Sequence, residues 1–135
     1  MAAGTTKTEL PRRGEILRYV YLFLRERRDR DEGVKERPVV VIDADPATRR
    51  VAVLAVTTKG DRYPGTLALP APVATAAGLD PGSAVLPTEY NAFTWLGYDI
   101  RPVVNGFVAG RLPPGFANKV LTAVAKAKPH AVDRD

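Results

Sequence analysis

The sequence contains no cysteine and a single histidine, His130. Without thiols the chain has no disulfide framework, no thiolate zinc site and no cysteine nucleophile. One histidine cannot build a paired-histidine acid–base mechanism or a histidine-rich metal site. Acids do cluster at Asp29, Asp31 and Glu32, but arginines lie between them, which favours a solvated charged loop. We therefore expect neither a metal nor a cofactor.

Several other signals are also missing. Ser83 follows Pro81 and Gly82 without the context of a nucleophile elbow, and no glycine-rich phosphate loop is present. No run approaches the roughly 20 apolar residues needed to cross a bilayer. Residues 1–11 lack the apolar stretch of a secretory signal. We expect a cytoplasmic protein that does not use a membrane as partner.

The composition is that of an ordinary folded domain. The chain has 135 residues, of which 45% are hydrophobic and 26% charged, values typical of one domain with its own core. Lysine and arginine number 20 against 15 acids, a formal charge of +5, which favours a polyanionic partner. We expect a flexible tail at 1–10, a single domain at 11–128 and a C-terminal tail at 129–135.

Short apolar runs bounded by turn residues predict a mainly β fold with a helix near the C-terminus. The predicted strands are residues 14–24, 39–42 after Pro38, 51–56, 66–69, 83–86 and 106–112. Residues 116–126 repeat apolar side chains at helical spacing and predict a helix packed on the sheet. Residues 25–36 and 71–82 read as loops, the second with at most one helical turn, and 89–100 shows no clean period. The sum indicates a small curled antiparallel sheet or barrel of the α+β class.

Arg37 stands directly before Pro38 and the apolar run that follows it. If the runs 39–42 and 51–56 pair antiparallel, the start of one lies beside the end of the other. Arg37 then shares an edge of the sheet with Thr57 and Thr58. A guanidinium there can hold a phosphate through two parallel hydrogen bonds. An ion pair with a nearby glutamate explains the same residue equally well, so both readings stay open.

The order of short motifs along the chain points to one family. The motifs are G-E-I at 14–16, a charged loop, K-E-R-P-V-V-V-I at 35–42, A-V-T-T at 55–58, V-L-P-T-E at 85–89 and G-R-L at 110–112. Together they resemble the MazF/PemK family of toxin endoribonucleases over residues 11–126. The resemblance implies an SH3-like barrel of the MazF/CcdB type.

The resemblance also implies an activity and its residues. Such toxins cleave single-stranded RNA, including mRNA, at specific sequences without a metal, by attack of the ribose 2′-hydroxyl on the adjacent phosphate. The implied catalytic pair is Arg37 and Thr57, and the implied RNA contacts are Lys35, Thr58, Lys59 and Glu89. Glu36 and Glu89 are the carboxylates near the motifs, and spacing establishes neither as the general base. The implied partners are RNA, a second copy in a homodimer and a cognate antitoxin.

Two further functions fit the same barrel. One is a noncatalytic module that binds RNA or a protein, and it is favoured if Arg37 is ion-paired away from Thr57. The other is a poison of a DNA topoisomerase, as in the related CcdB type. The run N-A-F-T-W at 91–95 departs from the polar and basic run that often follows the acid in this family. Substrate preference therefore differs from the family, or activity is lost.

Overall fold

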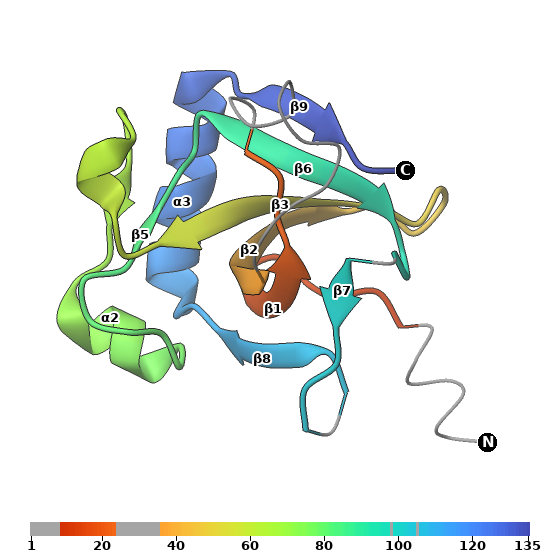
Figure 1. Ribbon diagram of the computed structural model, residues 1–135, viewed down its shortest axis with the longest axis horizontal. Helices are drawn as coiled ribbons and strands as arrows, with labels where there is room; N and C mark the ends of the chain where they lie inside the picture. The colour runs from red at the N-terminus through yellow and green to blue at the C-terminus, as the bar shows by residue number, and fades with distance from the viewer. Residues whose placement is uncertain (1–8, 24–35, 98, 105) are drawn as a thin grey trace.

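The computed structural model describes residues 9–23, 36–97, 99–104 and 106–135. In this part of the chain nine strands form one sheet, with helices beside it (Figure 1). The strands are β1 (Glu15–Val20), β2 (Glu36–Ala44), β3 (Arg50–Thr57), β4 (Leu67–Ala68), β5 (Ala84–Val85), β6 (Glu89–Thr94), β7 (Ile100–Arg101), β8 (Val108–Arg111) and β9 (His130–Asp133). The helices are the 3-10 turn η2 (Gly60–Arg62), α2 (Ala71–Ala76) and α3 (Pro114–Ala127). The predicted mainly β fold with a C-terminal helix is confirmed.

The centre of the sheet is the hairpin of β2 and β3, which pair antiparallel as predicted. Strand β1 flanks β2 on its other side. Strand β3 changes neighbours along its length, because its first residues pair with β6 and its last two pair with β5. Strand β1 likewise pairs with both β7 and β8. These changes of partner curl the sheet around the hairpin.

The two faces of the hairpin have different cores, because successive residues of a strand point to opposite faces. On one face Val40 and Leu54 belong to a cluster with Phe116 and Val120 of α3. The predicted packing of the C-terminal helix on the sheet is therefore confirmed, and Figure 1 shows α3 behind the central strands. The opposite face carries an aromatic cluster that contains Tyr19, Tyr21, Phe23, Phe93 and Trp95.

Strand β2 begins at Glu36, three residues earlier than predicted, so Pro38 lies inside a central strand. Pro38 is opposite Arg18 of β1, whereas the pairing of β2 with β3 begins only at Val39. A proline has no N–H to donate to a neighbouring strand, so it is disfavoured where strands pair on both sides. Because β2 pairs only with β1 at this level of the described sheet, the sheet tolerates the proline, and Arg37 lies within the strand.

The predicted C-terminal tail at 129–135 is wrong for residues 130–133, which form β9 parallel to β6. Val132 is buried there. Arg50 pairs with both Asp133 and Asp135, which fastens the end of the chain to β3. The partners of β9 are distant in sequence, so local pattern does not reveal the strand.

The other differences are smaller. Helix α2 has six residues and so exceeds the single turn predicted for its segment, while the undecided segment 89–100 contains β6 and the start of β7. The predicted loop at 25–36 lies outside the described residues except for Glu36, which opens β2. The predicted tail at 1–10 lies outside them except for its last two residues. Within the described residues, no helix has the length and apolar character to cross a membrane.

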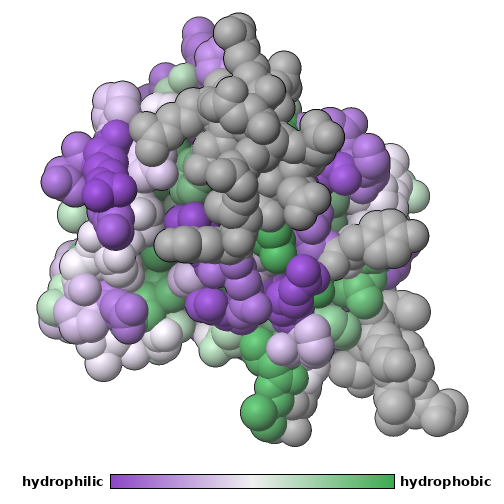
Figure 2. All heavy atoms as spheres, viewed as in Figure 1, coloured by the Kyte–Doolittle hydropathy of each residue, from purple (hydrophilic) through white to green (hydrophobic). Residues whose placement is uncertain are grey.

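Exposed large apolar side chains lie in the β7–β8 loop, at the start of β8 and between β6 and β7. Val104 is 87% exposed, Leu96 44% and Val108 39%. Figure 2 shows an apolar projection at the lower edge of the molecule, where this loop lies in Figure 1. These side chains lie away from both cores.

Candidate functional site

Arg37 and Thr57 meet at one edge of the hairpin. Extending the pairing of Val39 with Ala55 by two residues places Arg37 opposite Thr57. Val39 and Ala55 both belong to the aromatic face, so the alternation of the strands puts Arg37 and Thr57 on that face as well. Both residues line one pocket of about 460 Å³, which we call the Arg37 pocket.

The Arg37 pocket lies between this edge, η2 and the segment that joins α2 to β5. Its charged lining residues are Arg18, Arg37, Lys59, Arg62, Glu36 and Asp80, and Thr57, Thr58, Tyr63 and Ser83 add polar groups. Positive side chains therefore outnumber negative ones among the described lining residues. A concave surface of one predominant sign concentrates ligands of the opposite charge. The pocket suits an anion.

The guanidinium of Arg37 is held by an aromatic ring. Its Cζ atom lies 4.6 Å from the centre of the Phe23 ring, a cation–π contact. Its Nε atom is buried without a hydrogen-bond partner. Among the described residues no carboxylate forms an ion pair with Arg37, and Glu36 instead pairs with Arg18, with 2.8 Å between Oε2 and Nε. The guanidinium thus retains hydrogen-bonding capacity for a ligand.

Thr57 ends β3 with a buried side chain that is 6% exposed. Its Oγ1 atom accepts a hydrogen bond from the backbone N–H of Lys59, with 2.9 Å between Oγ1 and N. A threonine hydroxyl that accepts one bond can still donate its own proton. Thr58 and Lys59 are exposed and also line the pocket. The contact to Lys59 fixes the Thr57 oxygen while leaving it a donor.

Of the two remaining predicted RNA contacts, Glu89 does not join this group, and the other cannot be placed. Lys35 lies outside the described residues. Glu89 is buried at the start of β6 and does not line the Arg37 pocket. Its Oε2 atom accepts a hydrogen bond from the Tyr21 hydroxyl, with 3.2 Å between the oxygens.

The surroundings of Tyr21 connect Glu89 electrostatically to Arg37. Burial, together with the negative charge of Glu89, raises the pKa of Tyr21 well above its ordinary value, and the positive charge of Arg37 opposes that rise. Tyr21 therefore stays protonated and donates to Glu89. The arrangement gives Glu89 a place in the core beside the pocket, not a contact surface for a ligand.

Among the charged and aromatic lining residues, sequence reasoning missed Arg18, Arg62, Tyr63 and Asp80. Arg18 interrupts the apolar residues of β1, which is a local signal of a polar environment. Arg62 and Tyr63 follow the T-T-K-G run closely enough to suggest the same edge. Asp80 comes from the α2–β5 segment, and only the tertiary structure brings it to the pocket.

No protein-family model and no curated protein matches the chain. The chemistry of the Arg37 pocket is therefore the basis for a functional proposal.

Proposed function

We propose that the protein is a metal-independent endoribonuclease that cleaves single-stranded RNA, of the kind found as toxins in toxin–antitoxin systems. The observation that carries the proposal is the convergence of Arg37 and Thr57 in one pocket with an excess of positive charge. The absence of a carboxylate partner for Arg37 among the described residues favours a ligand role over a structural ion pair. The motif resemblance to the MazF/PemK family supports the same reaction.

The proposed reaction needs stabilisation of charge on a phosphate. The ribose 2′-hydroxyl attacks the adjacent phosphorus, the bond to the 5′-oxygen breaks, and the products are a 2′,3′-cyclic phosphate and a 5′-hydroxyl. Arg37 donates two hydrogen bonds to the nonbridging oxygens, where negative charge grows in the transition state. Thr57, with its oxygen fixed by the Lys59 N–H, donates a third and orients the phosphate.

The reaction also needs an acceptor for the 2′-hydroxyl proton. Glu36 and Asp80 are the carboxylates among the described lining residues. Glu36 is paired with Arg18, whereas the exposed Asp80 carboxylate has no ion-pair or hydrogen-bond partner in the described part of the chain. We assign proton acceptance to Asp80, and the proton for the leaving 5′-oxygen comes from solvent or from the same group.

The proposal extends to the partners that the resemblance implies. The protein would act in the cytoplasm as a homodimer, and a cognate antitoxin would block the Arg37 pocket. The exposed apolar side chains near the β7–β8 loop offer a surface for self-association. Light scattering on the purified protein should give twice the mass of one chain.

The test is cleavage of a long single-stranded RNA in the presence of a chelator. The wild type should cleave it, and Arg37→Ala and Thr57→Ala should each lower the rate by about 10²- to 10³-fold, the cost of losing one donor to a charged transition state. Arg13→Ala is the matched control, because Arg13 is 62% exposed and pairs with Asp43 outside the pocket.

Each competing function predicts a different result. RNA binding without cleavage by the wild type, over a range of sequences, would replace the nuclease with a noncatalytic binding module. Inhibition of a DNA topoisomerase without RNA cleavage would replace it with a poison of the CcdB type.

A further inference from the structure

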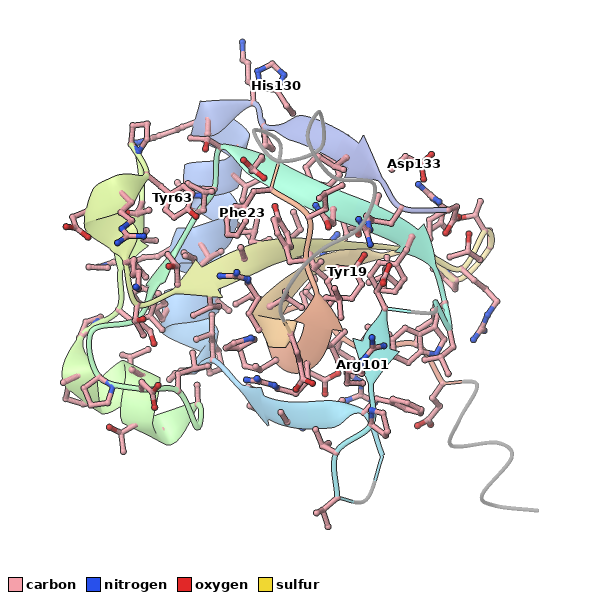
Figure 3. All side chains as sticks on the ribbon, viewed as in Figure 1. Tyr19, Phe23, Tyr63, Arg101, His130 and Asp133 are labelled. Carbon is pink, nitrogen blue, oxygen red and sulfur yellow. The ribbon has the colours of Figure 1, made fainter. Side chains whose placement is uncertain are left out.

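An aromatic pair forms one wall of the Arg37 pocket. Tyr63 follows η2, is partly exposed and lines the pocket. Its ring stacks on that of Phe23, with 4.9 Å between centroids and 15° between planes, and Figure 3 shows the two side chains beside each other. Phe23 is 1% exposed, so a core residue supports the tyrosine from below its ring.

Phe23 connects this wall to the guanidinium. The Phe23 centroid lies 4.6 Å from the Arg37 Cζ atom and 4.9 Å from the Tyr63 centroid, so these two groups are less than about 10 Å apart. Phe23 also packs edge-on against Tyr21, with 5.0 Å between centroids. The ring that positions the cation is therefore the ring that positions Tyr63, and the core fixes it.

The chemistry of these groups matches the two parts of a nucleotide. A guanidinium binds a phosphate through charge and paired hydrogen bonds. A partly exposed aromatic ring binds a nucleobase by stacking, which changes affinity by roughly ten- to a hundredfold for one base. Arg62 lines the pocket next to Tyr63 and adds a second positive charge on the same wall.

We propose that Tyr63 is the stacking platform for one unpaired nucleobase of the nucleic acid whose phosphate contacts Arg37. This inference rests on the proposed function and adds to it a base subsite. Bases in a duplex are already stacked and paired, so the platform selects single strands. Every base has a π-face, so Tyr63 discriminates little between bases. Its role is to position the strand so that one particular phosphate reaches Arg37.

The subsite is tested with single-stranded 2′-deoxy oligonucleotides, which lack the nucleophile and are not cleaved. Each carries the fluorescent base 2-aminopurine at a different position, and stacking on an aromatic ring quenches its emission. The wild type should quench one position strongly. Tyr63→Phe and Tyr63→Trp should keep the quenching, whereas Tyr63→Leu should lose it and weaken binding by about tenfold or more.

Tyr90→Leu is the matched control. Tyr90 is a partly buried tyrosine that packs against the core on the helix face and does not line the Arg37 pocket. This variant should bind and quench as the wild type does. If Tyr63→Leu does not fold, Tyr63→Phe and Tyr63→Trp still decide, because both keep a ring for stacking and lack the hydroxyl, so loss of quenching in both would overturn the subsite.

The outcomes separate this inference from the nuclease proposal. Equal quenching and affinity in the wild type and Tyr63→Leu overturn the subsite, as does a wild type that binds none of the oligonucleotides. Position-specific quenching that depends on the ring at residue 63 supports the subsite even if the wild type cleaves no RNA. In that case the nuclease proposal fails and a base-binding pocket remains.

Discussion

The Nε–H of Arg37 is buried and finds no acceptor in the described part of the protein, while its Cζ atom lies over the Phe23 ring. A buried donor without a partner costs about 1 to 3 kcal/mol of folding free energy. The cation–π contact offsets about 0.5 to 1 kcal/mol of this cost at a partly exposed site. Residues that oppose stability in this way concentrate at functional sites.

Replacing Arg37 by methionine should therefore stabilise the protein while abolishing the proposed RNA cleavage. Met fills the space beside Phe23 without a polar atom, so the free energy of unfolding should rise by about 1 kcal/mol. Urea denaturation of Arg37→Met and wild type measures the difference, with Arg13→Met as the exposed control. A loss of stability in Arg37→Met would mean that the guanidinium has a structural role instead.

The positions of some residues relative to the pocket could be predicted from the sequence, and those of others could not. Arg37 and Thr57 were predicted to share an edge because they flank two consecutive strands, and a hairpin brings such ends together. Asp80 was not predicted, because it reaches the pocket from a segment whose position depends on the whole fold. Glu89 was expected to contact RNA, yet it is buried and accepts a hydrogen bond from the Tyr21 hydroxyl. A buried acid and its partner 68 residues away leave no local pattern.

At the scale of elements, β8 and the end of α2 approach each other through Gly110. A Cβ atom at Gly110 would lie 2.3 Å from the backbone oxygen of Ala77, closer than any nonbonded contact allows. Gly110→Ala should therefore lower the free energy of unfolding by about 1 to 3 kcal/mol, the range for overpacking. At Gly115, in the first turn of α3, no atom lies within 4 Å of the added Cβ.

The Gly115→Ala variant is thus the control for the same chemical change in open space. It should leave stability unchanged or raise it by about 0.5 to 1 kcal/mol, as alanine favours a helix over glycine. Thermal denaturation of both variants measures the two effects. Similar shifts for the two would contradict the close approach of β8 to α2.

The end of β9 should loosen in acid. Slight burial of the Asp135 carboxyl acts to raise its pKa, but hydrogen bonds from Thr94 and the charge of Arg50 outweigh it and hold the pKa below the ordinary 3.8. A lowered pKa contributes stability that is present above the ordinary value and is lost as pH falls through the folded-state pKa. The protection of the Thr94 N–H, which donates to Asp135, should therefore drop below about pH 4.

Amide hydrogen exchange followed by NMR measures this protection. In Asp135→Asn the Thr94 amide should exchange faster already at neutral pH, and its acid-dependent step should shrink. An unchanged acid profile in Asp135→Asn would show that other carboxylates control the loosening.

The elements were predictable where their partners are near in sequence. The β2–β3 hairpin and α3 follow from apolar periodicity and turn residues within short windows. Strand β9 follows from none of these, because it forms by parallel pairing with β6. The start of β2 was predicted too late because the rule against proline in a central strand assumes neighbours on both sides. At Pro38 only β1 pairs with β2.

On the scale of the whole molecule, the charge of +5 and the positive excess of the Arg37 pocket predict RNA binding that weakens with salt. For single strands the slope of log K against log salt is about −0.7 for each phosphate contact. Lys59→Gln should make the slope shallower by about that amount. Lys119 is an exposed residue of α3 outside the pocket, so Lys119→Gln should leave the slope unchanged. Titration of a labelled single-stranded oligonucleotide at several salt concentrations measures both slopes, and equal slopes in the two variants would place the RNA elsewhere.

We propose that RNA bound in the Arg37 pocket is cleaved by attack of the RNA's own 2′-hydroxyl. The most direct measurement is the identity of the new ends after cleavage in chelator, combined with a substrate that carries one 2′-deoxy nucleotide at the cleaved position. The account predicts a 2′,3′-cyclic phosphate and a 5′-hydroxyl, with cleavage abolished by the deoxy substitution and lost in Arg37→Ala. A 5′-phosphate product, or unchanged cleavage of the deoxy-substituted substrate, would contradict it.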